Sequence, residues 1–141
     1  MNHLSLNQWT TRRWSVAEAV DGCVRHGLEA IGLAPPDVGV VVDCFHVWWD
    51  PDVFASIARV GSRIASFPVC DLLDPLPADV VLGRAMMGDG VIDFRPLRAA
   101  VEAAGYTGDI EVEIFNADVW AADPDEVVAT MKKRYAERVL G

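Results

Sequence analysis

Several apolar runs of this sequence end on a carboxylate, a pattern that could do chemistry. GVVVD ends on Asp43, FPVCD ends on Asp71, and EVEIF carries Glu113 close to its end. In parallel α/β proteins the C-terminal ends of the strands converge and ligands bind there, so these groups should lie close together. Converging carboxylates repel one another unless a cation or a proton lies among them. The pattern therefore indicates a hard divalent metal ion, Mg²⁺ or Mn²⁺, with His46 just above Asp43.

Each of these side chains also has a purely structural interpretation. A strand-terminal aspartate often caps the turn that follows it, and we favour that role for Asp71 but not for Asp43, which precedes an aromatic residue and a histidine. Glu111 and Glu113 share one face of their strand; they line a site if the strand is central and face solvent if it lies at an edge. A lone histidine such as His46 more often makes a structural hydrogen bond than binds a ligand. The order of the strands decides whether the two glutamates line a site.

The segment GRAMMGDG places Arg84 and Asp89 between glycines. A guanidinium beside free backbone N–H groups can clamp an anion, although glycines at these positions can equally serve only to shape a turn. The cysteines, Cys23, Cys44 and Cys70, are odd in number and lack metal-site spacing, so we expect reduced thiols in the core.

Predicted strands and helices alternate along almost the whole chain. Short apolar runs predict strands, and apolar residues at helical spacing predict helices. We expect strands at residues 3–8, 28–33, 39–43, 63–71 (interrupted by Pro68) and 109–115. We expect helices that begin after Ser15, Asp50-Pro51, Asp93 and Asp123-Pro124. This alternation predicts an α/β fold of parallel βα repeats, with about five strands and four helices packed outside the sheet.

Composition excludes several other classes of protein. The chain has 141 residues, of which 52% are hydrophobic and 23% charged, which is typical of a globular domain. No apolar run approaches the roughly 18 residues that a membrane span needs, so we expect a cytoplasmic protein without a membrane partner. The net charge of −9 disfavours a nucleic-acid partner.

The segments NHLSLNQWTTRRWSVAEAVDGCVRHGLEAIGL, VVVDCFHVWWDPD, GRAMMGDGVIDF and DIEVEIFNADVW together resemble the sugar phosphate isomerase/epimerase family, which has the xylose isomerase-like TIM barrel fold. The resemblance implies a divalent metal held by two glutamates, an aspartate and a histidine, and proton transfer beside a sugar carbonyl. It implies that Asp43 and Glu113 are metal ligands and that Glu113 is also catalytic. By the same resemblance, His46 and Arg84 bind the substrate, a sugar or sugar phosphate.

The sequence departs from the family at two of the implied ligands. Pro68 stands where the family often has a histidine, and the second glutamate belongs to a middle strand that this chain lacks. Since a TIM barrel takes about 250 residues, we expect residues 1–141 to form a single domain that is an incomplete, half TIM barrel. Residues 1–33 would be the first βαβ unit and residues 38–141 the last three βα units.

The closure of a barrel predicts the order of the strands in such a half barrel. The last strand of a barrel pairs with the first, so the retained strands should form one arc in the order second, first, eighth, seventh, sixth. The junction APPDV spans at most about 17 Å when fully extended. Parallel strands usually need a longer crossover. Either residues 28–33 leave their barrel position, or the ends of the arc are reorganised.

Two functions from different classes follow. The first is a metal-dependent sugar or sugar-phosphate isomerase/epimerase, which without the middle strands would have weak activity or none unless another subunit completed the barrel. The second is a non-enzymatic barrel remnant that acts through self-association, since both edges of the arc would expose strand surface and favour a homo-oligomer. A metal-dependent nuclease on the same barrel is disfavoured by the acidic charge.

Overall fold

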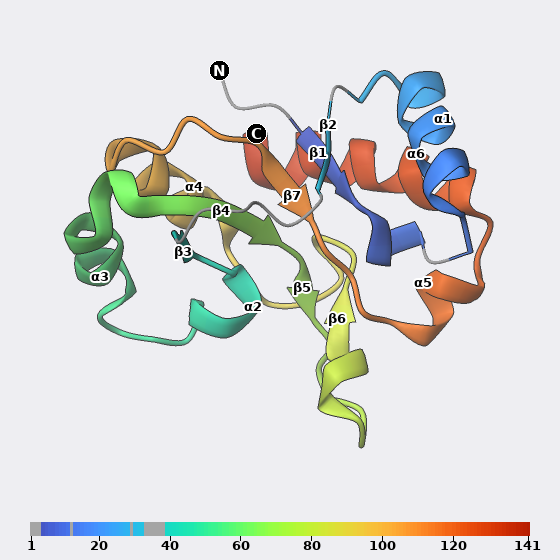
Figure 1. Ribbon diagram of the computed structural model, residues 1–141. Coiled ribbons are helices and arrows are strands. Elements are labelled where there is room, and N and C mark those ends of the chain that lie inside the picture. Colours follow the sequence, from blue (N-terminus) through green and yellow to red (C-terminus); the bar gives the residue numbers. More distant parts are fainter. Residues whose placement is uncertain (1–3, 12, 29, 33–38) are drawn as a thin grey trace.

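The centre of the molecule is a five-stranded parallel sheet with the strand order β2-β1-β7-β4-β3 (Figure 1). The computed structural model describes residues 4–11, 13–28, 30–32 and 39–141. The strands are β1 (Leu4–Asn7), β2 (Ala30–Gly32), β3 (Val40–Val41), β4 (Ile64–Val69) and β7 (Ile110–Val112). This order is the arc expected from the closure of a barrel, and the prediction of a parallel α/β fold is confirmed.

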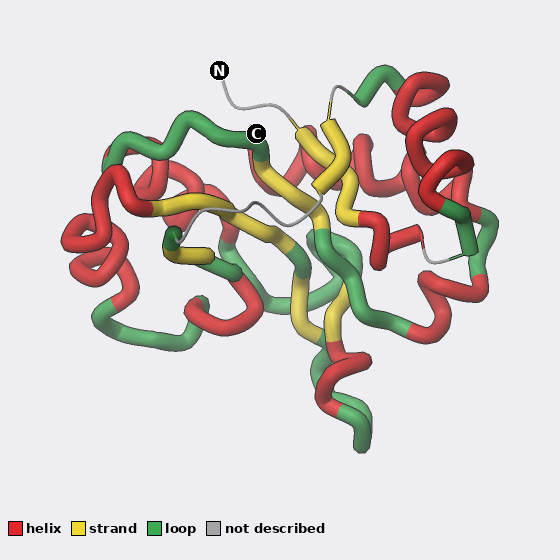
Figure 2. Tube along the Cα trace, in the orientation of Figure 1, coloured by secondary structure: helices red, strands yellow, loops and turns green. Residues whose placement is uncertain are grey.

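Six α-helices lie around this sheet in the described part of the chain (Figure 2). They are α1 (Val16–His26), α2 (Cys44–Val47), α3 (Val53–Val60), α4 (Phe94–Ala103), α5 (Ala117–Ala121) and α6 (Pro124–Arg134), the last continuing as a π-helix over Tyr135–Leu140. Short 3₁₀ turns are η1 (Gln8–Thr11), η2 (Gly61–Arg63) and η3 (Val80–Gly83). The four long helices are the predicted ones, whereas α2 and α5 are too short to show a helical period.

The helix ends follow the capping signals of the sequence. Ser15 and Glu18 form a capping box at the start of α1, and Gly27 ends that helix with φ of 64° in the left-handed region. Asp93 and Asp123 accept backbone N–H bonds at the starts of α4 and α6. Helix α3 begins only at Val53, because the turn before it contains a bond from the backbone N–H of Asp52 to the Asp50 carboxylate.

The strand register gives the sheet one apolar face and one polar face. Leu6 pairs with Val112, which pairs with Val69, and all three side chains are fully buried in the core beside the long helices. Because side chains alternate along a strand, the neighbouring positions point to the opposite, inner face. The inner face carries Ser5, Asn7, Val41, Ser66, Pro68, Glu111 and Glu113. In a closed barrel this face would line the interior.

Pro68 does not interrupt its strand, contrary to the sequence prediction. The Val42 N–H donates to the Ser66 carbonyl and the Glu113 N–H donates to the Val69 carbonyl, so alternate residues of β4 bond to opposite neighbours. The nitrogen of Pro68 therefore faces the side of β3, beyond the last paired residue of that strand. Proline has no N–H to donate on that side, so the pairing of β4 with β3 ends before Pro68 while its pairing with β7 continues.

The long loop after β4 contains its own structure. Strands β5 (Asp71–Leu72) and β6 (Arg84–Ala85) pair antiparallel and form a hairpin that projects from the sheet (Figure 1). Strand β2 keeps its place beside β1, and β3 is reduced to two residues with a register shift against β4, so the end of the arc at β3 is the irregular one. Residues 33–38 of the predicted junction lie outside the described residues.

Within the described ranges, no helix is long and apolar enough to cross a membrane. The three cysteines are buried and free, as the sequence predicts.

Candidate functional site

Arg84, at the start of β6, is the centre of a polar cluster. Its Nη2 lies 2.8 Å from Asp43 Oδ2, and its Nη1 lies 3.4 Å from Glu113 Oε2. Nη2 also lies 3.4 Å from His46 Nε2. The structure thus brings together the four residues that the sequence marks as site residues, although they come from three separate segments of the chain.

Asp43 combines a structural role with a role in this cluster. It lies two residues after the end of β3, and its Oδ1 accepts the Phe45 N–H at 2.9 Å, which makes it the N-cap of α2. Its other oxygen, Oδ2, faces Arg84 and lies 3.7 Å from His46 Nε2. The capping bond fixes the direction of the carboxylate, and the exposed His46 side chain sits at the open side of the cluster.

Glu113 is held from both sides. Asn7 Nδ2 donates to Glu113 Oε1 at 3.0 Å and to Glu111 Oε1 at 2.9 Å, while Arg84 faces Oε2. Strand β7 lies between β1 and β4, so it is central. The two glutamates therefore line the inner face of the sheet, and the edge-strand alternative is excluded.

The sequence did not reveal the residues that hold Arg84 in place. Its guanidinium lies between two aromatic rings, 4.8 Å from the centroid of Phe45 and 5.1 Å from that of Phe115. Asn116 Nδ2 donates to the Arg84 carbonyl at 2.9 Å. Asn7 was also missed. Its position as a polar residue that ends β1, as Asp43 ends its own strand segment, was the available signal.

The charges of the cluster perturb one another. Burial raises the pKa of Glu113, and the guanidinium of Arg84 opposes that rise. Burial also raises the pKa of Glu111. The hydrogen bond from Asn7 lowers this pKa, and the negative charge of Glu113 raises it further. Burial raises the pKa of the Cys70 thiol to about 12, so the sulfur beside Arg84 is a neutral thiol and no nucleophile.

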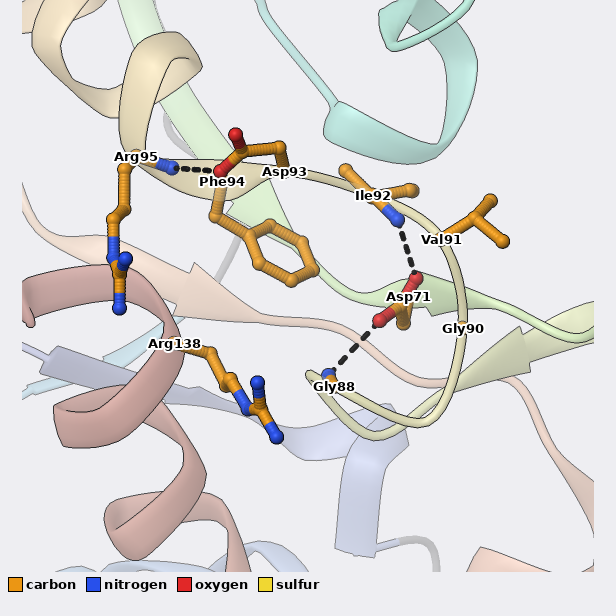
Figure 3. Close-up of a pocket in the computed structure, with 9 residues that line it drawn as sticks. All are labelled: Asp71, Gly88, Gly90, Val91, Ile92, Asp93, Phe94, Arg95 and Arg138. Carbon is orange, nitrogen blue, oxygen red and sulfur yellow. Dashed lines mark hydrogen bonds between the residues drawn. The ribbon is translucent and has the colours of Figure 1, made fainter.

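Asp71 has the structural role favoured by the sequence. Its carboxylate is 1% exposed and accepts the N–H groups of Leu72 and Ile92 at Oδ1 and that of Gly88 at Oδ2 (Figure 3). The bonds from Gly88 and Ile92 fold the loop after β6 back onto β5. The anion clamp suggested for GRAMMGDG does not form as predicted, because Arg84 faces carboxylates and Asp89 pairs with Arg134 at 2.9 Å.

We expect Glu111→Gln to raise the free energy of unfolding at pH 7. A carboxyl group with a raised pKa binds its proton more tightly in the folded protein than in the unfolded one, so stability falls as pH rises from about 4.5 through the folded pKa. Glutamine removes this loss and keeps an oxygen for Asn7. Urea unfolding at pH 7 and at pH 4 measures the gain, which should disappear at the lower pH. Glu137→Gln, an exposed control, should show no gain; a wild type as stable as Glu111→Gln at pH 7 would contradict the prediction.

The divalent metal expected from the sequence does not fit the described residues by themselves. Both oxygens of Asp43 and both of Glu113 already have a hydrogen-bond or ion-pair partner, and the cation that contacts both carboxylates is the guanidinium of Arg84. Within the described ranges, no three histidine, cysteine, aspartate or glutamate side chains gather in a way that could hold a metal ion. Pro68, on the inner face next to Glu111, adds no ligand.

Comparison with solved structures gives the same architecture over less than half of each relative. The protein SMc04130 from Sinorhizobium meliloti 1021 is 45% identical, with a TM-score of 0.68 over 86% of this chain and 42% of its own. The IolI protein, solved with a bound zinc atom, is 25% identical, with a TM-score of 0.61 over 72% of this chain and 37% of its own. L-ribulose 3-epimerase, at 17% identity and a TM-score of 0.51 over 88% of this chain and 41% of its own, shares the fold.

This chain therefore spans about two fifths of the length of the solved proteins that it matches. None of the curated proteins matches the sequence significantly. A family model, the xylose isomerase-like TIM barrel, matches residues 14–135. Together with the strand order of a barrel arc, this match shows that the chain belongs to the xylose isomerase-like TIM barrel family and has the fold of a partial barrel.

Proposed function

We propose that this chain carries part of an isomerase or epimerase site that moves a proton on the carbon next to the carbonyl of a sugar or sugar phosphate. The observation that carries the proposal is the contact between Glu113 and Arg84 on the inner face of the sheet. It joins a half-buried carboxylate to a buried cation at the place where a barrel binds its ligands.

The chemistry of these two groups supports this reaction. A general base works best when its pKa lies near the working pH, and burial moves the pKa of Glu113 upward. Removal of the proton places negative charge on the carbonyl oxygen, which a preorganised guanidinium stabilises. In the proposal, Glu113 takes and returns the proton, Arg84 faces the carbonyl oxygen, and the exposed imidazole of His46 binds a substrate hydroxyl.

Metal dependence is a separate part of the proposal. A divalent ion would have Asp43 and Glu113 as its ligands from this chain, and the further ligands would have to come from outside the described residues. The zinc atom of the IolI structure supports a divalent ion in the family site. Because the described residues do not complete such a site, the proton transfer is assigned here only to groups of this chain.

Hydrogen exchange in D₂O tests the proposal. We expect the protein to exchange the protons beside the carbonyl of a ketose, with dihydroxyacetone and D-fructose as probes, as followed by ¹H NMR. Glu113→Gln should slow this exchange by about 100-fold, the lower range for general base catalysis. Glu137→Gln changes an exposed carboxylate of the C-terminal π-helix and should leave the rate of exchange unchanged. Equal exchange by wild type and Glu113→Gln would contradict the proposal.

A second function, a barrel remnant that acts through self-association, is favoured by the open edges of the sheet. Among the residues that the structure describes, strands β2 and β3 each have one strand neighbour, and Val41 on the inner face is 57% exposed. An unpaired edge with an apolar neighbour favours pairing with a second copy. Absence of exchange in every sample, together with a dimer in analytical ultracentrifugation, would favour this function over the enzymatic one.

A further inference from the structure

A cavity of about 240 Å³ lies beside the loop that follows β6, and it is separate from the candidate site. Its walls come from the loop around Gly88 and Gly90, the start of α4 and the C-terminal π-helix (Figure 3). Neither Arg84 nor any of the carboxylates that contact it lines this space. The volume is below the roughly 300–1,000 Å³ of pockets that enclose drug-sized ligands, so the cavity suits a small group.

Two guanidinium groups line this cavity, although the protein as a whole carries a net charge of −9. Arg95 comes from α4 and Arg138 from the π-helix. Among the residues that the structure describes, neither forms an ion pair, whereas their neighbours Arg98 and Arg134 pair with Glu102 and Asp89. The Arg95 guanidinium donates through Nη2 to the Glu137 carbonyl, at 3.1 Å. The cationic groups at the cavity are thus left without a carboxylate partner in the described chain.

The position of Arg138 is set by close packing on the loop. A Cβ added to Gly88 would lie 2.7 Å from Arg138 Nε, and Gly88 has φ of 90°, a conformation that side chains other than glycine rarely adopt. Figure 3 shows Arg138 extended toward Gly88 along one wall of the cavity. The absence of a side chain at Gly88 therefore allows the guanidinium of Arg138 to lie directly against the backbone of the loop.

The carboxylates at the cavity are engaged by the backbone. Asp71 is 1% exposed, and its two oxygens accept three N–H groups. Asp93 Oδ1 accepts the Arg95 N–H at 3.4 Å as the cap of α4. Both oxygens of Asp71 and one oxygen of Asp93 accept backbone N–H groups, and neither carboxylate forms an ion pair with Arg95 or Arg138 among the described residues. The Arg138 guanidinium and the donors of Arg95 other than Nη2 are free to bind a ligand.

We propose that this cavity binds a small oxyanion, the phosphate or carboxylate group of a small molecule, between Arg95 and Arg138. Guanidinium groups bind both kinds of oxyanion through paired, charge-assisted hydrogen bonds. This site is independent of the proposed proton transfer, since it shares no residue with the Arg84 cluster.

The test is a ¹⁵N NMR titration of the protein with inorganic phosphate, and separately with acetate, at constant ionic strength. We expect the amide signals of Gly88, Gly90 and Val91 to shift with either anion. Arg138→Gln and Arg95→Gln should each weaken binding about tenfold, as expected for the loss of a charge-assisted bond. Arg63→Gln, which removes the same charge from an exposed residue at the N-terminal end of β4, should leave binding unchanged.

The outcomes separate the two sources of the anion and the competing explanations. Binding of phosphate alone assigns the site to phosphate compounds, and binding of acetate alone assigns it to carboxylates. Absence of shifts with both anions, equal weakening by Arg63→Gln, or shifts confined to residues around His46 and Cys70 would each overturn the proposal. The spectra of the variants show directly whether they are folded, and Arg95→Gln and Arg138→Gln test the site from two different helices.

Discussion

Arg84→Met is expected to lower the free energy of unfolding by about 3 kcal/mol, in the lower range for breaking a buried ion pair. The Arg84 side chain is 8% exposed and its Nη2 lies 2.8 Å from the Asp43 carboxylate, which is 9% exposed. Methionine fills much of the space between Phe45 and Phe115, so the main loss is electrostatic. Asp43 and Glu113 would then face each other without a cation. Urea unfolding monitored by circular dichroism at pH 7 measures the change.

Two further variants separate charge from packing. Arg84→Lys keeps the charge but loses the planar fork that reaches both carboxylates, so it should fall between wild type and Arg84→Met. Arg84→Met combined with Asp43→Asn removes both partners and should recover part of the loss, since replacing a whole buried pair costs less than removing half of it. A loss below 1 kcal/mol in Arg84→Met would show that the guanidinium is not required to balance the carboxylates.

Asp71→Ala is expected to cost about 3–5 kcal/mol, because it leaves three N–H groups without their acceptor and each such loss costs roughly 1–3 kcal/mol. The carboxylate is 1% exposed and accepts bonds of 2.9, 3.0 and 2.9 Å from Leu72, Ile92 and Gly88. Urea unfolding measures the global loss. Hydrogen exchange at the Gly88 and Ile92 amides shows whether the loop opens before the rest of the protein.

The neighbouring Asp89 provides a matched control. Its ion pair with Arg134 is partly exposed, with side-chain exposures of 47% and 29%, and such pairs contribute about 1 kcal/mol or less. Asp89→Ala should therefore cost much less than Asp71→Ala. Asp71→Asn should fall between them, since its amide keeps one acceptor oxygen but places a donor opposite another. Equal losses in Asp71→Ala and Asp89→Ala would contradict the assigned role of Asp71.

Helices and strand order could be predicted from this sequence because their signals are local or topological. Ser15, Asp93 and Asp123 begin helices for the reason that makes them frequent caps: their side-chain oxygens accept free backbone N–H groups. The arc of strands follows from the closure of a barrel, in which the last strand must pair with the first. Helix α2 was missed because four residues are too few to show a helical period. The course of β4 through Pro68 was missed because it depends on where the neighbouring strand β3 ends.

In the candidate site, too, some residues could be predicted from the sequence and others could not. Residue types and strand ends in the sequence selected Asp43, His46, Arg84 and Glu113, and the structure brings these four together. Their assignment as metal ligands, catalytic base and substrate contacts stays a prediction, as do the domain limits and the partners. The support given by Asn7 and Asn116 could not be predicted, since each bonds to a residue that is distant in sequence.

By itself, the sequence predicted that carboxylates would converge at the ends of parallel strands, with a cation or a proton among them, and it favoured a divalent metal ion as that cation. Which positive group occupies that position was decided by tertiary structure. The hairpin of β5 and β6 returns the chain so that Arg84 lies between Asp43 and Glu113, with a ring on each side of its guanidinium. The physical reason is distance: Coulomb interactions between side chains depend on separations in space, and the fold alone sets those separations.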